Sequence, residues 1–170
     1  MALKGSGSDV TSSFITAAAA DPNGISTAAT IGSATNLTIN GALADGGSVT
    51  MDSPRNVTIL SAGDDSGITF TVTGTDESND AQTEAITGAN AGTATGSSFF
   101  KTVTQIATSA ASAGNVSAGS GTSCSGVISV ARCRLRGIYV VNGTGAATIV
   151  FREGSGTGTI RMQFATVAGV

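Results

Sequence analysis

Apolar residues alternate with threonine in the middle of the chain, between residues 67 and 75. Ile68, Phe70 and Val72 occupy every second position, and threonines stand between them. Because successive side chains of a strand point to opposite faces, this pattern puts one face toward a core and the other toward water. β-branched and aromatic residues also suit a pleated, half-buried surface. The pattern predicts a β-strand here and an all-β fold for the chain.

Shorter alternating runs flank this strand and are separated by turn residues. They predict further strands over residues 36–40, 48–52, 56–60, 82–87, 99–106 and 115–117. Pro54 is expected to interrupt the strand ladder, as at a strand start or an edge. We expect the polar run 82–87 near a sheet edge, and a β-bulge where the alternation breaks after Phe100. Short strands at close, regular spacing are typical of an immunoglobulin-like β-sandwich or a related barrel, which we assign to residues 36–122.

The stretch before the sandwich, residues 1–35, has no clear period and predicts an extended N-terminal arm. It contains the flexible sequence GSGS at residues 5–8 and the turn signal DPNG at residues 21–24. Two interpretations are open. The arm orders against a neighbouring subunit, or it is a loose terminus.

After a Gly/Ser-rich link at residues 118–126, the sequence predicts a small C-terminal β-meander over residues 123–170. Alternation in residues 127–141, 147–151 and 160–164 indicates three strands with turns between them. Three strands do not close a domain, so their apolar face must be covered by the sandwich or by another chain. The candidates for this buried interface are Leu135, Tyr139, Phe151, Met162 and Phe164.

The most specific polar feature is a stripe of three arginines, Arg132, Arg134 and Arg136, on one side of the first meander strand. Arginine is favoured at protein interfaces, so the stripe can dock on an acidic face of a neighbouring subunit. The alternative is the solvated side of the meander. Nucleic acid is less favoured as a partner, because no aromatic platform accompanies the stripe.

Composition and charge narrow the function classes. Only 11% of the residues are charged, the net charge is −3, and histidine is absent. The common general base and the most frequent transition-metal ligand are therefore missing, and we expect neither an enzyme nor a cofactor. No basic field attracts nucleic acid. No apolar run is long enough to cross a bilayer, and residues 1–20 lack a signal-peptide core.

Two smaller features have competing interpretations. Cys124 and Cys133 are expected to be reduced thiols, although a hairpin could bring them together. The acidic cluster at residues 76–80 offers oxygen atoms of the kind that calcium prefers. It fails the EF-hand pattern at Ala81 and Thr87, and an ordinary solvated turn is the favoured interpretation.

Several stretches resemble a widespread family of tailed-bacteriophage proteins. They read PRNVTILSAGDDSGITFTVTGTD at residues 54–76, QTEAITGANAGTATG at residues 82–96 and FKTVT at residues 100–104. The stretch CRLRGIYV at residues 133–140, with ATIVFREG at residues 147–154, looks like a second phage-associated β unit. The resemblance implies a component of the phage particle and supplies no catalytic residues.

These observations together lead us to expect a capsid decoration or cement protein, made in the bacterial cytoplasm and located in the virion. Its expected partners are further copies of itself, with a trimer most plausible, and the major capsid protein or other virion proteins. A tail-fibre or receptor-binding module is the alternative, although such modules favour exposed aromatic residues and Tyr139 is the single Tyr or Trp of the chain. A glycan-active enzyme has almost no support among the residues.

Overall fold

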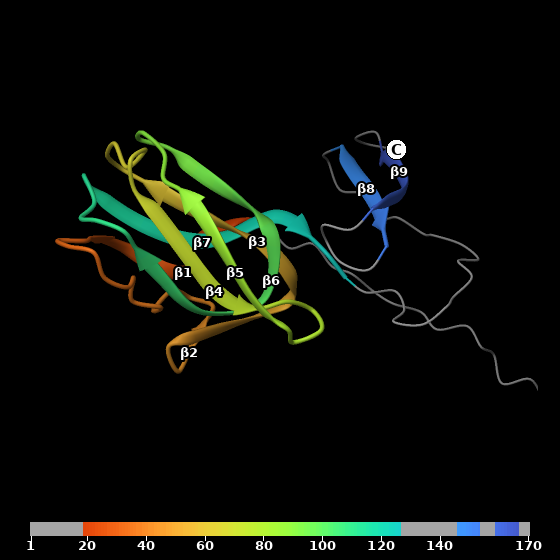
Figure 1. The fold of residues 1–170 in the computed structure, drawn as a ribbon, viewed down its shortest axis with the longest axis horizontal. Coiled ribbons are helices and arrows are strands. Elements are labelled where there is room, and N and C mark those ends of the chain that lie inside the picture. Colours follow the sequence, from red (N-terminus) through yellow and green to blue (C-terminus); the bar gives the residue numbers. More distant parts are fainter. Residues whose placement is uncertain (1–18, 127–145, 154–158, 167–170) are drawn as a thin grey trace, which may run out of the picture.

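A computed structural model describes residues 19–126, 146–153 and 159–166 of the chain. These residues form strands, turns and loops and contain no helix, so the predicted all-β fold class is confirmed. The strands are β1 (Asp21–Thr30), β2 (Ala44–Asp45), β3 (Ser48–Ser61), β4 (Thr69–Thr75), β5 (Ala81–Thr87), β6 (Thr93–Thr108), β7 (Asn115–Cys124), β8 (Ala147–Arg152) and β9 (Ile160–Thr166) (Figure 1).

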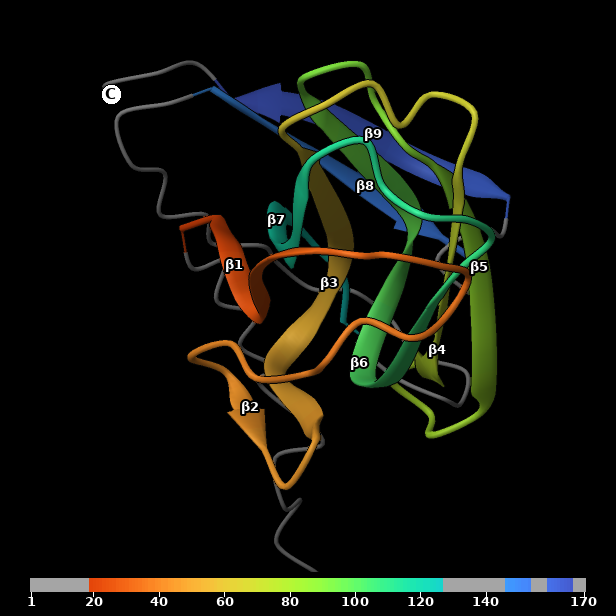
Figure 2. The ribbon, with the colours of Figure 1, turned by 90° about the vertical axis from the view of Figure 1, so that its left-hand side faces the viewer.

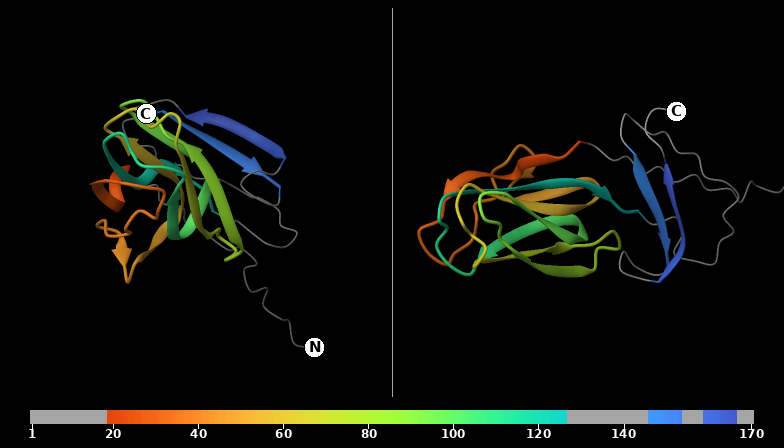
Figure 3. Two further views of the ribbon diagram at one scale, coloured as in Figure 1. Left: turned by 60° about the vertical axis from the view of Figure 1, so that its left-hand side comes forward. Right: turned by 90° about the horizontal axis from the view of Figure 1, so that it is seen from above.

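The first seven strands form one antiparallel sheet that folds over on itself as a sandwich. The strand order is β1-β7-β3-β6-β4-β5, with β2 paired to β3. β6 makes the connection between the layers, because its first part pairs with β3 and its last part pairs with β4. Figure 3 (right) shows β1, β7 and β3 in one layer and β6, β4 and β5 in the other. The specifically immunoglobulin-like connectivity stays a prediction.

The hydrophobic core lies between these two layers. Its largest fully buried apolar side chains are Phe70, Phe100, Ile25, Ile59, Ile106, Val49, Val57, Val72, Val103 and Val116. The central alternating strand is confirmed as β4, in which Phe70 and Val72 are fully buried and the threonines between them are half-buried. The edge position predicted for residues 82–87 is also confirmed, because β5 ends the strand order.

The predicted bulge lies in β6, opposite Gly74 of β4. Thr73 pairs with Gln105 and Gly74 pairs with Val103, so Thr104 is the extra residue. The bulge brings the β6 backbone very close to Gly74. A Cβ atom at position 74 would lie only 1.9 Å from the carbonyl oxygen of Thr102, so a glycine is required there.

Two predicted strands differ from the structure. Residues 36–40 do not form a strand, since only an isolated bridge joins Asn36 to Ala107. The runs 48–52 and 56–60 belong to one continuous strand, β3, in the middle of the sheet. The strand start or edge expected at Pro54 is wrong, because Pro54 lies inside β3. It does interrupt the ladder, since the register with β6 shifts between Thr50 and Arg55, and the missing N–H is tolerated at this irregularity.

Parts of the predicted arm and of the predicted link are strands of the sandwich. Residues 21–30, expected within the arm, form β1 and pair with β7 of the same chain. The Gly/Ser-rich link is strand β7 as far as Cys124. Gly119 shows why small residues stand there, because a Cβ atom at this position would lie 1.8 Å from the carbonyl oxygen of Asp21. Close packing of β1 on β7, and not flexibility, explains this composition.

β8 and β9 form a separate antiparallel hairpin. In Figures 1 and 3 it lies apart from the sandwich. The first predicted meander strand, residues 127–141, lies outside the described residues, and so do residues 1–18 of the predicted arm.

Candidate functional site

The β8–β9 hairpin brings together three of the residues predicted to form an interface. Ile149 pairs with Phe164 and Phe151 pairs with Met162, so these four side chains share one face. The rings of Phe151 and Phe164 stack with their centroids 6.0 Å apart and their planes 27° from parallel. This geometry is the offset arrangement that aromatic pairs prefer.

That apolar face is poorly covered. Met162 is 47% exposed and Ile160, near the start of β9, is 46% exposed. Phe151 and Phe164 are half-buried. An isolated two-stranded hairpin is marginally stable in water, since it buries too little apolar surface. The hairpin is therefore the part of the described chain whose stability depends most on a further contact.

A charge pair lies at the loop end of the hairpin, where β8 finishes and β9 begins. Arg161 Nε donates a 2.8 Å hydrogen bond to Glu153 Oε2, and Nη2 also contacts that oxygen. Glu153 N donates to the carbonyl oxygen of Thr159 at 3.0 Å. Both charged side chains are well exposed, so this pair contributes little to stability and mainly holds the two strand ends together.

Five of the predicted interface residues lie outside the described residues: Arg132, Arg134, Arg136, Leu135 and Tyr139. Their roles as an arginine stripe and an apolar partner stay predictions. The interface role of Phe151, Met162 and Phe164 also stays a prediction, although the structure shows that they occupy one face.

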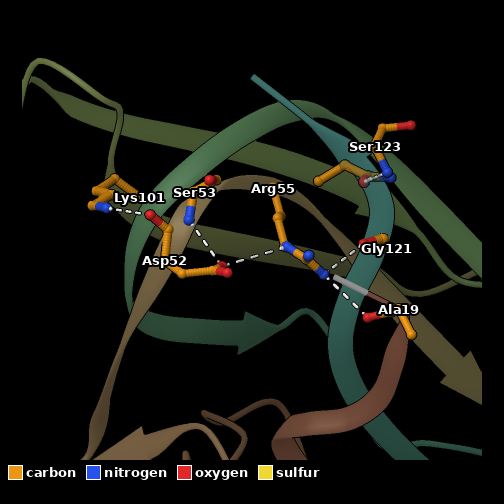
Figure 4. Close-up of polar contacts among 8 residues, drawn as sticks. Ala19, Asp52, Ser53, Arg55, Lys101, Gly121 and Ser123 are labelled. Carbon is orange, nitrogen blue, oxygen red and sulfur yellow. Dashed lines mark hydrogen bonds and ion pairs between the residues drawn. The ribbon is translucent and has the colours of Figure 1, made fainter. Parts of the chain in front are cut away.

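Sequence reasoning missed a buried arginine at the end of the sandwich where β7 finishes. Arg55 lies on β3 and is only 3% exposed. Its Nη1 atom donates to the carbonyl oxygens of Ala19 at 3.1 Å and of Gly121 at 3.4 Å (Figure 4). The arginine therefore ties β3 both to the segment just before β1 and to β7.

Few opposite charges compensate this guanidinium. Its Nε atom is 3.8 Å from Asp52 Oδ1, and the Asp52 side chain is 61% exposed, so water weakens the pair. Asp52 is itself engaged, because its carboxylate accepts from Ser53 N at 2.8 Å and its carbonyl accepts from Lys101 Nζ at 3.0 Å. Arg55 Nη2 is buried with no hydrogen-bond partner among the residues that the structure places.

The neighbourhood of Arg55 is organised for holding chain segments and not for catalysis. Asn56 Oδ1 accepts a 3.1 Å hydrogen bond from Ser123 N. Ser125 N donates to the carbonyl oxygen of Pro54 at 2.9 Å. The last residues of β7 and those just after it are thus fixed to β3. The one sequence signal was the charge of Arg55 inside an otherwise apolar strand pattern.

Cys124 is a free, half-buried thiol that pairs with Arg55 across β3 and β7. Burial raises the pKa of the thiol, while the positive charge of Arg55 opposes that effect and the negative charge of Asp52 adds to it. A raised pKa keeps the thiol protonated and unreactive near neutral pH. Cys133 lies outside the described residues, so the predicted state of that thiol is untested.

The acidic turns use their carboxylates for internal hydrogen bonds. Asp76 Oδ1 accepts from Ser78 N at 2.8 Å and from Asp80 N at 3.0 Å. Asp64 Oδ1 accepts from the backbone N and the hydroxyl of Ser66, and these bonds lower the pKa of Asp64. Within the described ranges, no three acidic or cysteine side chains gather as a metal-binding group.

Comparisons with known proteins give this chain no relative. No family model, no curated protein and no solved structure matches it. In the part of the chain that the structure places, no helix is long and apolar enough to span a membrane.

Proposed function

We propose that this chain is a structural protein of a tailed-phage particle, a homo-oligomeric capsid decoration or cement protein. The observation that supports it most is the hairpin β8–β9. Its apolar face carries Phe151, Met162 and Phe164, and it is only partly covered. Such a face suits burial against another protein in an assembly.

Two further observations support a structural role. The sandwich packs its apolar side chains into a core of its own, so it can serve as a stable body that presents the hairpin. The side chains of Arg55, Asn56 and Asp76 each hold a backbone segment in place. The stretches that resemble tailed-phage proteins point to the virion as the assembly.

The location can be tested by measuring copy number. The protein would be quantified by mass spectrometry in purified particles of the phage that encodes it. A decoration protein should be present in proportion to the major capsid protein. A small, fixed number of copies would instead favour the tail-fibre alternative, and absence from the particle would overturn the proposal.

The role of the hairpin can be tested with paired variants. Particles lacking the protein would be incubated with wild type, with Met162→Ser/Phe164→Ser, and with the control Gln163→Ala on the opposite face of β9. Burying one large apolar side chain is worth about 1.5–3 kcal/mol. We therefore expect the double variant to bind about tenfold more weakly or worse, and the control to bind like wild type. Equal binding by all three proteins would remove the hairpin from the proposed contact.

A further inference from the structure

The two edge strands of the sandwich, β1 and β5, differ in whether other parts of the chain hydrogen-bond to their outer side. At one edge, residues 40–43 cover β1. Gly41 N donates to the carbonyl oxygen of Ile25 at 3.0 Å, and Leu43 N donates to that of Gly24 at 2.8 Å. Asn40 Oδ1 accepts from Thr27 N at 3.0 Å. This edge has no free row of backbone groups to offer another strand.

At the opposite edge, β5 has a backbone that bonds only to β4. Within the described residues, no backbone group or side chain makes a hydrogen bond to β5 from its outer side. Figure 2 shows β5 at the margin of the sandwich away from β1. An uncovered edge of this kind is a ready template for pairing with another strand.

Two of the usual devices that protect an edge, a bulge and a proline, are missing from β5. Its pairing with β4 runs from Thr69–Thr87 to Thr75–Ala81 without a register shift, so no bulge twists it away. It contains no proline, and Glu84 is its one charged residue. Its outer face carries only small uncharged side chains, which are Ala81, Thr83, Ala85 and Thr87.

Glu84 turns inward toward β6, where its carboxylate is satisfied within the same chain. Its Oε1 atom accepts from Ser97 N at 2.6 Å, from the Ser97 hydroxyl at 2.9 Å and from Ser98 N at 3.2 Å. Gln82 reaches the same strand and donates to the carbonyl oxygen of Phe99 at 2.9 Å. These two side chains close the sandwich between β5 and β6 and leave the outer backbone of β5 open.

We propose that β5 pairs antiparallel with β5 of a second copy across a two-fold axis at Thr83. A two-fold axis perpendicular to the sheet keeps each side chain on its own face, so opposed residues must have the same parity. Centring the pair on Glu84 would oppose two carboxylates, which is unfavourable. Centring it on Thr83 opposes Gln82 to Glu84 and Ala81 to Ala85. The small outer side chains then meet without a clash.

This contact would be one of the contacts through which the protein performs the proposed structural role, and the inference rests on that role. Five paired residues make an interface far smaller than the roughly 800 Å² per partner of a stable complex. The pairing is therefore weak between isolated molecules and suited to a surface that carries many copies. A two-fold contact joins two copies, so it would link one expected trimer to the next and would not build the trimer itself.

Disulfide trapping tests the pairing, because it captures weak contacts. In a background with Cys124→Ala and Cys133→Ala, Thr83→Cys would be oxidised at high protein concentration and run on a non-reducing gel. Opposed Cα atoms in antiparallel strands are about 4.5–5.5 Å apart, within disulfide range. The matched control is Thr87→Cys, on the same strand and face. In the proposed register its two copies lie about 27 Å apart, from eight residues at about 3.4 Å each. We expect a covalent dimer from Thr83→Cys at least tenfold more abundant than from Thr87→Cys.

A mixing experiment fixes the register. Ala81→Cys protein mixed with Ala85→Cys protein should form the heterodimer in excess over either homodimer. Circular dichroism of each reduced variant verifies that it is folded. Equal trapping at Thr83 and Thr87, or no heterodimer excess, would overturn the β5 pairing. So would cross-linking of Thr83→Cys only to a different protein in the particle. None of these results would change the copy number of the protein in the virion, so the proposed function is judged separately.

Discussion

The sandwich and the β8–β9 hairpin are built from the same kind of alternating strand, but they bury their apolar side chains to different degrees. In the sandwich, Phe70 and Phe100 are fully buried by the other layer of the same chain. In the hairpin, Phe151 and Phe164 stack on each other and stay half-exposed. The strand pattern therefore specifies local structure equally well in both regions. What differs is whether the described chain supplies the opposing layer, and only the sandwich is complete in that sense.

The largest expected effect contrasts Phe100→Ala with Phe164→Ala. Removing a fully buried phenylalanine leaves a cavity and costs about 3–5 kcal/mol. Phe164 lies on the separate hairpin, so its removal should change the free energy of unfolding of the sandwich by less than about 0.5 kcal/mol. Urea unfolding followed by far-UV circular dichroism measures both values. A cost for Phe164→Ala equal to that for Phe100→Ala would show that hairpin and sandwich unfold as one unit.

A second, smaller effect concerns the glycines that let strands of the sandwich approach one another. Gly119→Ala would place a Cβ atom against the backbone of Asp21, so β1 must move away from β7. We expect the free energy of unfolding to fall by about 1–3 kcal/mol or more, as for other overpacked sites. Gly67→Ala is the matched control, because nothing lies within 4 Å of its Cβ position. The same urea titration should find the control within about 0.5 kcal/mol of wild type. If the two variants behaved alike, close packing would not be the reason for Gly119.

Gly119 also illustrates what the sequence can and cannot predict. The alternation of Ile68, Phe70 and Val72 depends on local geometry alone, and it predicted β4 correctly. The role of Gly119 depends on a partner strand almost a hundred residues earlier, and a run of glycine and serine looks the same in a linker and in a tightly packed strand. β1 was missed for the same reason, since its one fully buried large apolar side chain, Ile25, gives no period.

In the candidate site, too, features set by local alternation could be predicted and features set by distant partners could not. Phe151, Met162 and Phe164 could be placed on one face from alternation, and the register of β8 with β9 agrees. The Arg55 junction could not be predicted, because its acceptors are backbone carbonyls at Ala19 and Gly121. Carbonyl groups are present at every residue and leave no signal in a sequence. A contact with another molecule is equally invisible from within one chain.

The smallest expected effect is on the pH dependence of the free energy of unfolding. It tests whether the Cys124 thiol, at the boundary of the sandwich, behaves as a buried or as an exposed thiol. Burial favours the neutral form, so the pKa of Cys124 is higher in the folded state than in the unfolded state. The thiol therefore contributes stability that is fully present below the unfolded pKa and is lost as pH rises through the folded pKa. In a Cys133→Ala background, the free energy of unfolding should fall more between pH 7 and pH 10 with Cys124 than with Cys124→Ala. At pH 7 the folded protein should also react more slowly with iodoacetamide than the urea-unfolded protein does, since less thiolate is present. Equal pH dependence in the two proteins, together with equal alkylation rates, would show that Cys124 is as well hydrated as a thiol on an open loop.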